Sequence, residues 1–133
     1  MSNVKMIQDL YAAFGRGDIE AVLGALDAKV EWREAEGNPY QPTGEAFVGP
    51  ESVLKNLFVR LGEDWTPFVV NTQSFHDAGD TVVMEGRYTG THKATGKSLD
   101  AQVCHVWKVR GGKVTSFQQY VDTAQLREVM GAS

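Results

Sequence analysis

Apolar positions in the first half of the chain repeat with the period of an α-helix. The first group shares one helical face, at Val4, Ile7, Leu10, Tyr11 and Phe14. Residues 15–18 then end this helix, and Asp18 is the expected N-cap of a second one. A third helix is expected to begin at residues 49–51 (Gly-Pro-Glu) and to end at Gly62. The sequence thus predicts three helices that each bury one apolar face.

Between the second and third helices the helical period is lost. Residues 28–32 resemble a short strand, with Val30 and Trp32 on one side. Residues 33–48 follow neither period and contain two prolines. Because a loop of this length in a compact domain commonly serves as a lid or a binding loop, we expect it to border a binding site.

From Phe68 onward the period changes from about 3.6 to about 2, which is typical of strands. The predicted strands cover residues 68–76, 81–91, 98–109 and 113–121. Short turns rich in glycine separate them, so consecutive strands are expected to be antiparallel. A last helix is expected over residues 124–130, with Thr123 as its cap. Helices followed by an antiparallel meander predict an α+β fold.

Length and charge narrow the class of protein. The chain has 133 residues, so residues 1–133 are interpreted as a single domain. A formal net charge of −4 gives no basic surface for nucleic acid or an anionic membrane. Apolar stretches are far shorter than the roughly 20 residues of a membrane span. Cys104 is the only cysteine, which excludes an internal disulfide and favours a reducing, cytoplasmic location.

The sequence lacks the motifs of several cofactor chemistries. The three histidines fall on different stretches, and no Cys-x-x-Cys or His-x-x-x-His spacing occurs, so no metal site is expected. Gly-x-Ser-x-Gly, P-loop and Gly-x-Gly-x-x-Gly motifs are also missing, which leaves serine hydrolase and nucleotide-binding functions without support. We therefore expect no cofactor.

His105, in the predicted strand 98–109, is the first candidate for chemistry. Alternation puts it on the same face as Leu99, Ala101, Val103, Trp107 and Val109. Such a histidine is either a core residue bonded to one neighbour or a pocket imidazole with a pKa near neutrality that exchanges a proton. The sequence leaves both interpretations open.

Asp122, at the end of the last predicted strand, is the second candidate. It either caps the C-terminal helix or pairs with an arginine, or it is a desolvated carboxylate that acts as a base. The strand before it has two mixed faces, with Gln118 on one and Gln119 on the other. This pattern fits a polar cavity on one side and a subunit interface on the other, or a bulge that changes the parity of the strand.

Large side chains are the candidates for lining a pocket. The predicted lining residues are Trp32, Tyr40, Arg87, Trp107 and Tyr120. The aromatic ones, together with Trp65, offer flat surfaces to an apolar ligand, although such residues also commonly form the core. Arg87 either reaches the pocket or forms an ion pair with Glu85.

Six short segments occur in a characteristic order along nearly the whole chain. They are residues 11–18 (Tyr-Ala-Ala-Phe-Gly-Arg-Gly-Asp), 30–32 (Val-Glu-Trp), 49–51 (Gly-Pro-Glu), 105–109 (His-Val-Trp-Lys-Val), 112–114 (Gly-Lys-Val) and 120–123 (Tyr-Val-Asp-Thr). This order resembles the SnoaL-like, ketosteroid-isomerase-related proteins of the nuclear transport factor 2-like superfamily. The resemblance implies a cone-shaped fold, in which N-terminal helices pack on a strongly curved antiparallel sheet around one deep pocket. It also implies a homodimer packed through the sheet.

The chain departs from two branches of this superfamily at their site residues. Ketosteroid isomerases carry a proton-shuttling aspartate where this chain has Trp32, and their oxyanion tyrosine falls at Leu10, one position from Tyr11. The position of their second aspartate corresponds to a residue at or near Cys104 or His105 in this chain. Limonene-type epoxide hydrolases use an Arg-x-Asp motif that none of the four long strands carries. Neither activity is expected.

SnoaL-like polyketide cyclases carry a general-base aspartate at the place of Asp122. The resemblance therefore implies removal of a proton next to a carbonyl, with Asp122 as base, His105 as donor or acid, and Trp32, Tyr40 and Trp107 as walls. We expect a small hydrophobic or aromatic carbonyl ligand and cofactor-independent isomerase, cyclase or hydrolase chemistry. The alternative is a non-catalytic module of the same fold that binds a small ligand or supports assembly.

Overall fold

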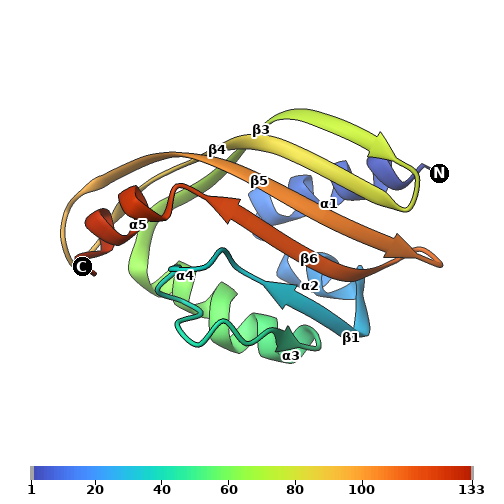
Figure 1. The fold of residues 1–133 in the computed structure, drawn as a ribbon, viewed down its shortest axis with the longest axis horizontal. Coiled ribbons are helices and arrows are strands. Elements are labelled where there is room, and N and C mark those ends of the chain that lie inside the picture. Colours follow the sequence, from blue (N-terminus) through green and yellow to red (C-terminus); the bar gives the residue numbers. More distant parts are fainter. Residues whose placement is uncertain (1, 133) are drawn as a thin grey trace.

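The computed structural model describes residues 2–132, which form helices on one side of a curled sheet (Figure 1). The helices are α1 (Asn3–Gly15), α2 (Ile19–Gly24), α3 (Pro50–Val53), the π-helical turn η1 (Leu54–Phe58), α4 (Val59–Asp64) and α5 (Thr123–Met130). The strands are β1 (Leu26–Arg33), β2 (Phe47–Val48), β3 (Trp65–Ala78), β4 (Thr81–His92), β5 (Ser98–Arg110) and β6 (Lys113–Val121). This arrangement confirms the predicted α+β class.

Helix α1 begins and ends where the sequence predicts, and α2 begins directly after the predicted N-cap. Ile7 and Leu10 of α1 are buried against the sheet, and the Asp18 carboxylate caps α2 by accepting a hydrogen bond from the backbone N–H of Ala21 at 3.2 Å. The third predicted helix starts at Pro50 but continues past Gly62 as α3, η1 and α4. Among residues 2–132, no helix is long and apolar enough to cross a membrane.

The sheet is mixed, because β1 runs parallel to β6. Its strand order is β2-β1-β6-β5-β4-β3, and all other neighbours are antiparallel, including the four long strands as predicted. Trp32 lies opposite Phe117 in the parallel pair. The purely antiparallel sheet expected from the sequence is thus wrong at this pair, because β1 and β6 are joined by the whole intervening chain rather than by a short turn.

A bulge settles the parity of the last strand. The pairing of β5 with β6 shifts register between Lys108 and Val109. Val114 and Phe117 are therefore both buried although they are three positions apart, where strict alternation would put them on opposite faces. Beyond the bulge, Gln119 points inward with 3% of its surface exposed, and Tyr120 points outward with 58% exposed.

Helix α5 lies at one end of the curled sheet (Figure 1). Its N-cap is Asp122, one residue before the predicted Thr123, and the Asp122 carboxylate accepts a hydrogen bond from the backbone N–H of Gln125 at 3.1 Å. Leu126 and Val129 are buried in the core cluster that contains residues of β4 and β5. Helix α5 thereby closes one end of the space enclosed by the curled sheet (Figure 1).

Candidate functional site

A cavity of about 60 Å³ lies between the helices and the concave face of the sheet. Its walls are mostly aromatic and aliphatic, as at Phe14, Leu57, Trp32, Phe68, Trp107 and Phe117. The volume has room for several water molecules. Seven polar side chains that line it hydrogen-bond to one another or to aromatic N–H groups: Tyr11, Glu34, Asn38, Tyr40, Tyr88, His105 and Gln119. A mainly apolar cavity with a few convergent polar groups is typical of a small-molecule site.

His105 joins two tyrosines in the centre of the site. Its Nδ1 atom lies 2.5 Å from the Tyr11 hydroxyl on α1, and its Nε2 atom lies 2.6 Å from the Tyr88 hydroxyl on β4. Only 4% of the residue is exposed. Burial lowers the pKa of His105 to about 3, because the charged form would lose its hydration. The imidazole is therefore neutral at physiological pH, which differs from the near-neutral pKa expected for a proton-exchanging histidine.

Each tyrosine hydroxyl also receives a hydrogen bond from the opposite side. The indole N–H of Trp107 donates to the Tyr11 hydroxyl at 2.8 Å, and the Gln119 side-chain amide donates to the Tyr88 hydroxyl at 2.8 Å. Burial raises the pKa of both tyrosines, so both are protonated phenols. We call the series Tyr11, His105 and Tyr88 the Tyr–His–Tyr chain.

Glu34 is a buried carboxyl on the same cavity wall. It is 7% exposed, and the indole N–H of Trp32 donates to its Oε2 atom at 3.3 Å. No Lys, Arg or His of the described chain forms an ion pair with it. Burial raises the pKa of Glu34 to about 8, and the Trp32 hydrogen bond only partly offsets that rise. A carboxyl of this kind can release and take up a proton near neutral pH.

The loop between β1 and β2 holds Glu34 in place. Gln41 accepts a hydrogen bond from the backbone N–H of Glu34 at 3.0 Å and donates one to the backbone oxygen of Trp32 at 3.1 Å. Gln119 of β6 accepts from the backbone N–H of Ala35 at 3.2 Å and from the Asn38 amide at 2.9 Å. The predicted loop therefore borders the cavity and is tied to the sheet by buried amides.

Tyr40, farther along this loop, lines the cavity from a different side. Its hydroxyl donates to the Asp64 carboxylate at 2.7 Å and accepts from the Trp65 indole at 3.0 Å. The Arg60 guanidinium lies 4.7 Å from the centre of the Tyr40 ring. These contacts fix the loop to the end of α4 and the start of β3.

The structure brings four of the predicted site residues together at the cavity and separates three from it. The cavity-lining residues are Trp32, Tyr40, His105 and Trp107. Arg87 lies on the outer face of the sheet, where its Nε atom is 2.6 Å from an Asp100 carboxylate oxygen, so its partner is neither the pocket nor Glu85. Tyr120 is exposed on that same outer face.

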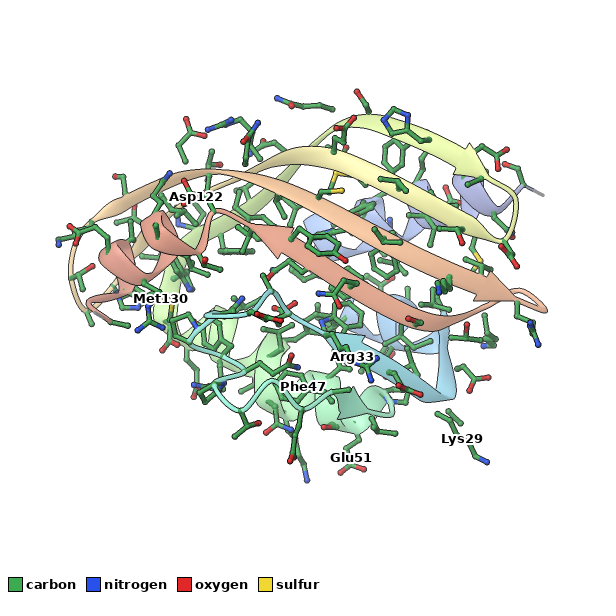
Figure 2. The ribbon with its side chains drawn as sticks, viewed as in Figure 1. Lys29, Arg33, Phe47, Glu51, Asp122 and Met130 are labelled. Carbon is green, nitrogen blue, oxygen red and sulfur yellow. The ribbon has the colours of Figure 1, made fainter. Side chains whose placement is uncertain are left out.

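Asp122 also lies outside the cavity. Its carboxylate is exposed and caps α5 at the point where β6 ends (Figure 2). It borders a shallow groove on the outer face of the sheet together with Arg87, Cys104 and Tyr120. Asp122 therefore caps the helix, which was one of the three roles that the sequence left open for it.

The sequence did not identify Tyr11, Glu34, Tyr88 and Gln119 as site residues; Tyr11 was predicted only as part of the apolar face of the first helix. Glu34 follows Trp32 by two positions, so continuing the alternation of β1 would have put both on one face. Tyr88 shares its parity with the buried residues Val82 and Met84. The sequence did not show that Gln119 points inward, because the bulge in β6 interrupts the alternation of buried and exposed positions.

Within residues 2–132, no three His, Cys, Asp or Glu side chains lie together in a way that could hold a metal ion.

The chain belongs to the SnoaL-like domain family, whose model matches residues 7–117. An NTF2-like protein from Burkholderia thailandensis E264 is 36% identical, with a TM-score of 0.91 and 98% of each chain covered. TerC, crystallised with polyporic acid, is 25% identical, with a TM-score of 0.85 and 98% of each chain covered. A putative SnoaL-like polyketide cyclase from Jannaschia sp. CCS1 is 18% identical, with a TM-score of 0.83 over 98% of this chain and 92% of that one. A search of curated proteins gave no match. The predicted family and fold are thus confirmed.

Proposed function

We propose that this protein binds a small hydrophobic or aromatic carbonyl compound in the cavity and moves a proton next to the carbonyl group. Glu34 is the acid–base residue in this proposal. The observation that carries it is a buried carboxyl on an otherwise largely apolar wall, with a pKa raised to about 8 and an indole N–H as its hydrogen-bond donor. Asp122 is not assigned the role of base, because its carboxylate is exposed and caps α5.

The aromatic walls favour a flat ligand. Trp32 and Phe117 are stacked, with ring centroids 3.8 Å apart, and Trp107 meets both rings edge-on. TerC, a relative of this chain, was crystallised with polyporic acid, and that supports a small organic ligand for the present protein as well.

The proposed step is removal of a proton by ionised Glu34. The C–H bond beside the ligand carbonyl breaks, an O–H bond forms on the Glu34 carboxyl, and the electron pair moves onto the carbonyl oxygen. A tyrosine hydroxyl of the Tyr–His–Tyr chain stabilises the oxygen as negative charge develops. Return of the proton from Glu34 to a different carbon completes an isomerisation. In a cyclisation, the enolate carbon adds to a second carbonyl, and Glu34 returns its proton to the oxygen of that carbonyl.

The test is deuterium exchange at the methyl group of acetophenone in D₂O, followed by NMR. We expect the protein to accelerate exchange over buffer, and Glu34→Gln to reduce that acceleration by about a hundredfold or more while affinity changes only a few-fold. The rate should rise with pH toward about 8, because the carboxylate form of Glu34 is the base. Asp122→Asn is the matched control and should retain the rate.

Two results would contradict the assignment. If Glu34→Gln retained the wild-type rate, Glu34 would not be the base, and loss of the rate in Asp122→Asn alone would return that role to Asp122. If acetophenone bound to the wild-type protein but exchanged no faster than in buffer at the same pH, the protein would be better described as a non-catalytic binding module.

A further inference from the structure

We propose that the Tyr–His–Tyr chain holds one hydroxyl proton that no protein group accepts, so that the cavity selects ligands with an acceptor oxygen. The inference rests on the proposed function, since it specifies which small molecules the same cavity takes. It also assigns His105 a positioning role: its tautomer decides which tyrosine offers that proton.

The donors at both ends of the chain are fixed by chemistry. Gln119 accepts hydrogen bonds at Oε1 from Ala35 and Asn38, so its Nε2 group must donate to the Tyr88 oxygen. The indole nitrogen of Trp107 is a donor only, so the Tyr11 oxygen must accept from it. Each tyrosine oxygen therefore already receives one hydrogen bond before His105 is considered.

His105 then divides the two hydroxyl protons unequally. A neutral imidazole has one N–H group and one lone pair, so it donates to one tyrosine and accepts from the other. The tyrosine that donates to His105 has committed its proton. The tyrosine that receives the His105 N–H keeps its own proton free, and no further acceptor contacts either hydroxyl among residues 2–132. Both Tyr11 and Tyr88 line the cavity, so the free proton is available to a ligand there.

The hydroxyl proton without an acceptor makes the cavity selective for ligands that carry an acceptor oxygen. A carbonyl or enolate oxygen completes the hydrogen bonding of the chain, whereas an apolar group of the same shape leaves a buried hydroxyl unpaired. With the proton of the imidazole on Nδ1, the free hydroxyl is that of Tyr11; with the proton on Nε2, it is that of Tyr88. A bound oxygen therefore favours one tautomer of His105.

The first experiment compares acetophenone with α-methylstyrene, which has the same shape but carries a CH₂ group in place of the carbonyl oxygen. We expect acetophenone to bind the wild-type protein about tenfold more tightly, the typical effect of one hydrogen bond to a buried group. This preference should disappear in Tyr11→Phe/Tyr88→Phe. Tyr120→Phe, the same substitution on the outer face, is the matched control and should keep it.

The second experiment measures ¹⁵N chemical shifts of His105 at neutral pH, without and with acetophenone. We expect one protonated and one unprotonated ring nitrogen in the free protein, and a single tautomer in the complex. Tyr11→Phe should favour the proton on Nε2 and Tyr88→Phe the proton on Nδ1, because an N–H without a partner is costly. These single variants decide the question even if the double variant does not fold.

The outcomes separate this inference from the proposed function. Failure of both probes to bind would contradict the small-molecule function and this inference with it. Equal affinity for the two probes would contradict the selectivity alone, leaving an apolar cavity that binds by shape. A doubly protonated His105 in the free protein would overturn the proton count whatever binds.

Discussion

Glu34 and His105 face the same cavity, and burial moves their pKa values in opposite directions. The carboxyl is neutral when protonated, so burial raises the pKa of Glu34 to about 8. The imidazole is neutral when deprotonated, so burial lowers the pKa of His105 to about 3. The folded protein thus keeps both groups uncharged near neutral pH. Each group destabilises the fold at pH values where it is charged in the unfolded chain but neutral in the folded protein.

The two effects should cancel between about pH 4.5 and 6.5, where stability is greatest, and stability should fall on either side of that range. The unfolded chain loses the Glu34 proton above its ordinary pKa of 4.5, so the contribution of Glu34 to stability declines as pH rises from there to about 8. It gains the His105 proton below 6.5, so the contribution of His105 declines as pH falls toward 3. Urea unfolding between pH 4 and 9 measures the decline in stability on both the acid and the alkaline side.

Glu34→Gln should remove the decline in stability at alkaline pH and be about 5 kcal/mol more stable than the wild type at pH 9. Glu36→Gln alters an exposed carboxyl two residues away and should leave the profile unchanged. A decline at alkaline pH that persists in Glu34→Gln would show that this carboxyl is not held protonated by the fold.

Strands β3 and β4 owe their curvature to two glycines opposite irregular pairings. The register shifts beside the pairs Phe68–Gly90 and Thr72–Gly86. A Cβ atom on Gly86 would lie 2.2 Å from the backbone oxygen of Asn71, closer than any real contact allows. The missing side chains let the strands approach and bend, and Tyr88 lies between these two positions. The bend is thus coupled to the placement of a cavity residue.

Gly86→Ala should destabilise the protein by about 2 kcal/mol, because the added methyl group forces two backbones apart. It should also weaken acetophenone binding through displacement of Tyr88. Gly62→Ala is the matched control: this helical glycine has nothing within 4 Å of its Cβ position and should gain about 0.5–1 kcal/mol. Equal unfolding midpoints for the two variants, measured in urea, would contradict this account of the bend.

The outer face of the sheet carries no helix within the described residues 2–132. It has a shallow groove of about 610 Å³ bordered by Arg87, Cys104, Tyr120 and Asp122. Tyr120 is a large aromatic side chain with 58% of its surface exposed. We propose, from the resemblance to SnoaL-like proteins and the exposed Tyr120, that two copies of the chain pack through this face, which would bury Tyr120 and leave the cavity on the opposite side.

Sedimentation equilibrium should therefore give the mass of two chains for the wild type. Tyr120→Glu should give the mass of one chain, because it would place a charge on the face proposed to form the interface. Val59→Glu substitutes another exposed apolar residue, on α4, and should remain dimeric. If Tyr120→Glu had the wild-type mass, this face would not be the dimer interface.

The sequence by itself determined most of the elements and most of their buried faces, although the short strand β2 (Phe47–Val48) lies within the predicted loop. Periods of about 3.6 and 2 report which side of a helix or strand avoids water, and that information is local. For this reason the helical face at Ile7 and Leu10, the capping role of Asp18 and the inward position of His105 were all predictable. The family followed from the order of short segments, again a property of the sequence.

Only the tertiary structure decided which of these buried faces contact one another and which side chains meet there. The parallel pairing of β1 with β6 and the bulge that turns Gln119 inward depend on contacts between distant segments. Tyr11 and His105 are 94 residues apart, and Ala35 and Gln119 are 84 apart. The acidity of Glu34 depends on how completely these segments exclude water from it. Periodicity reports that a side chain is buried, whereas its partners and its proton affinity are set by what the rest of the chain places around it.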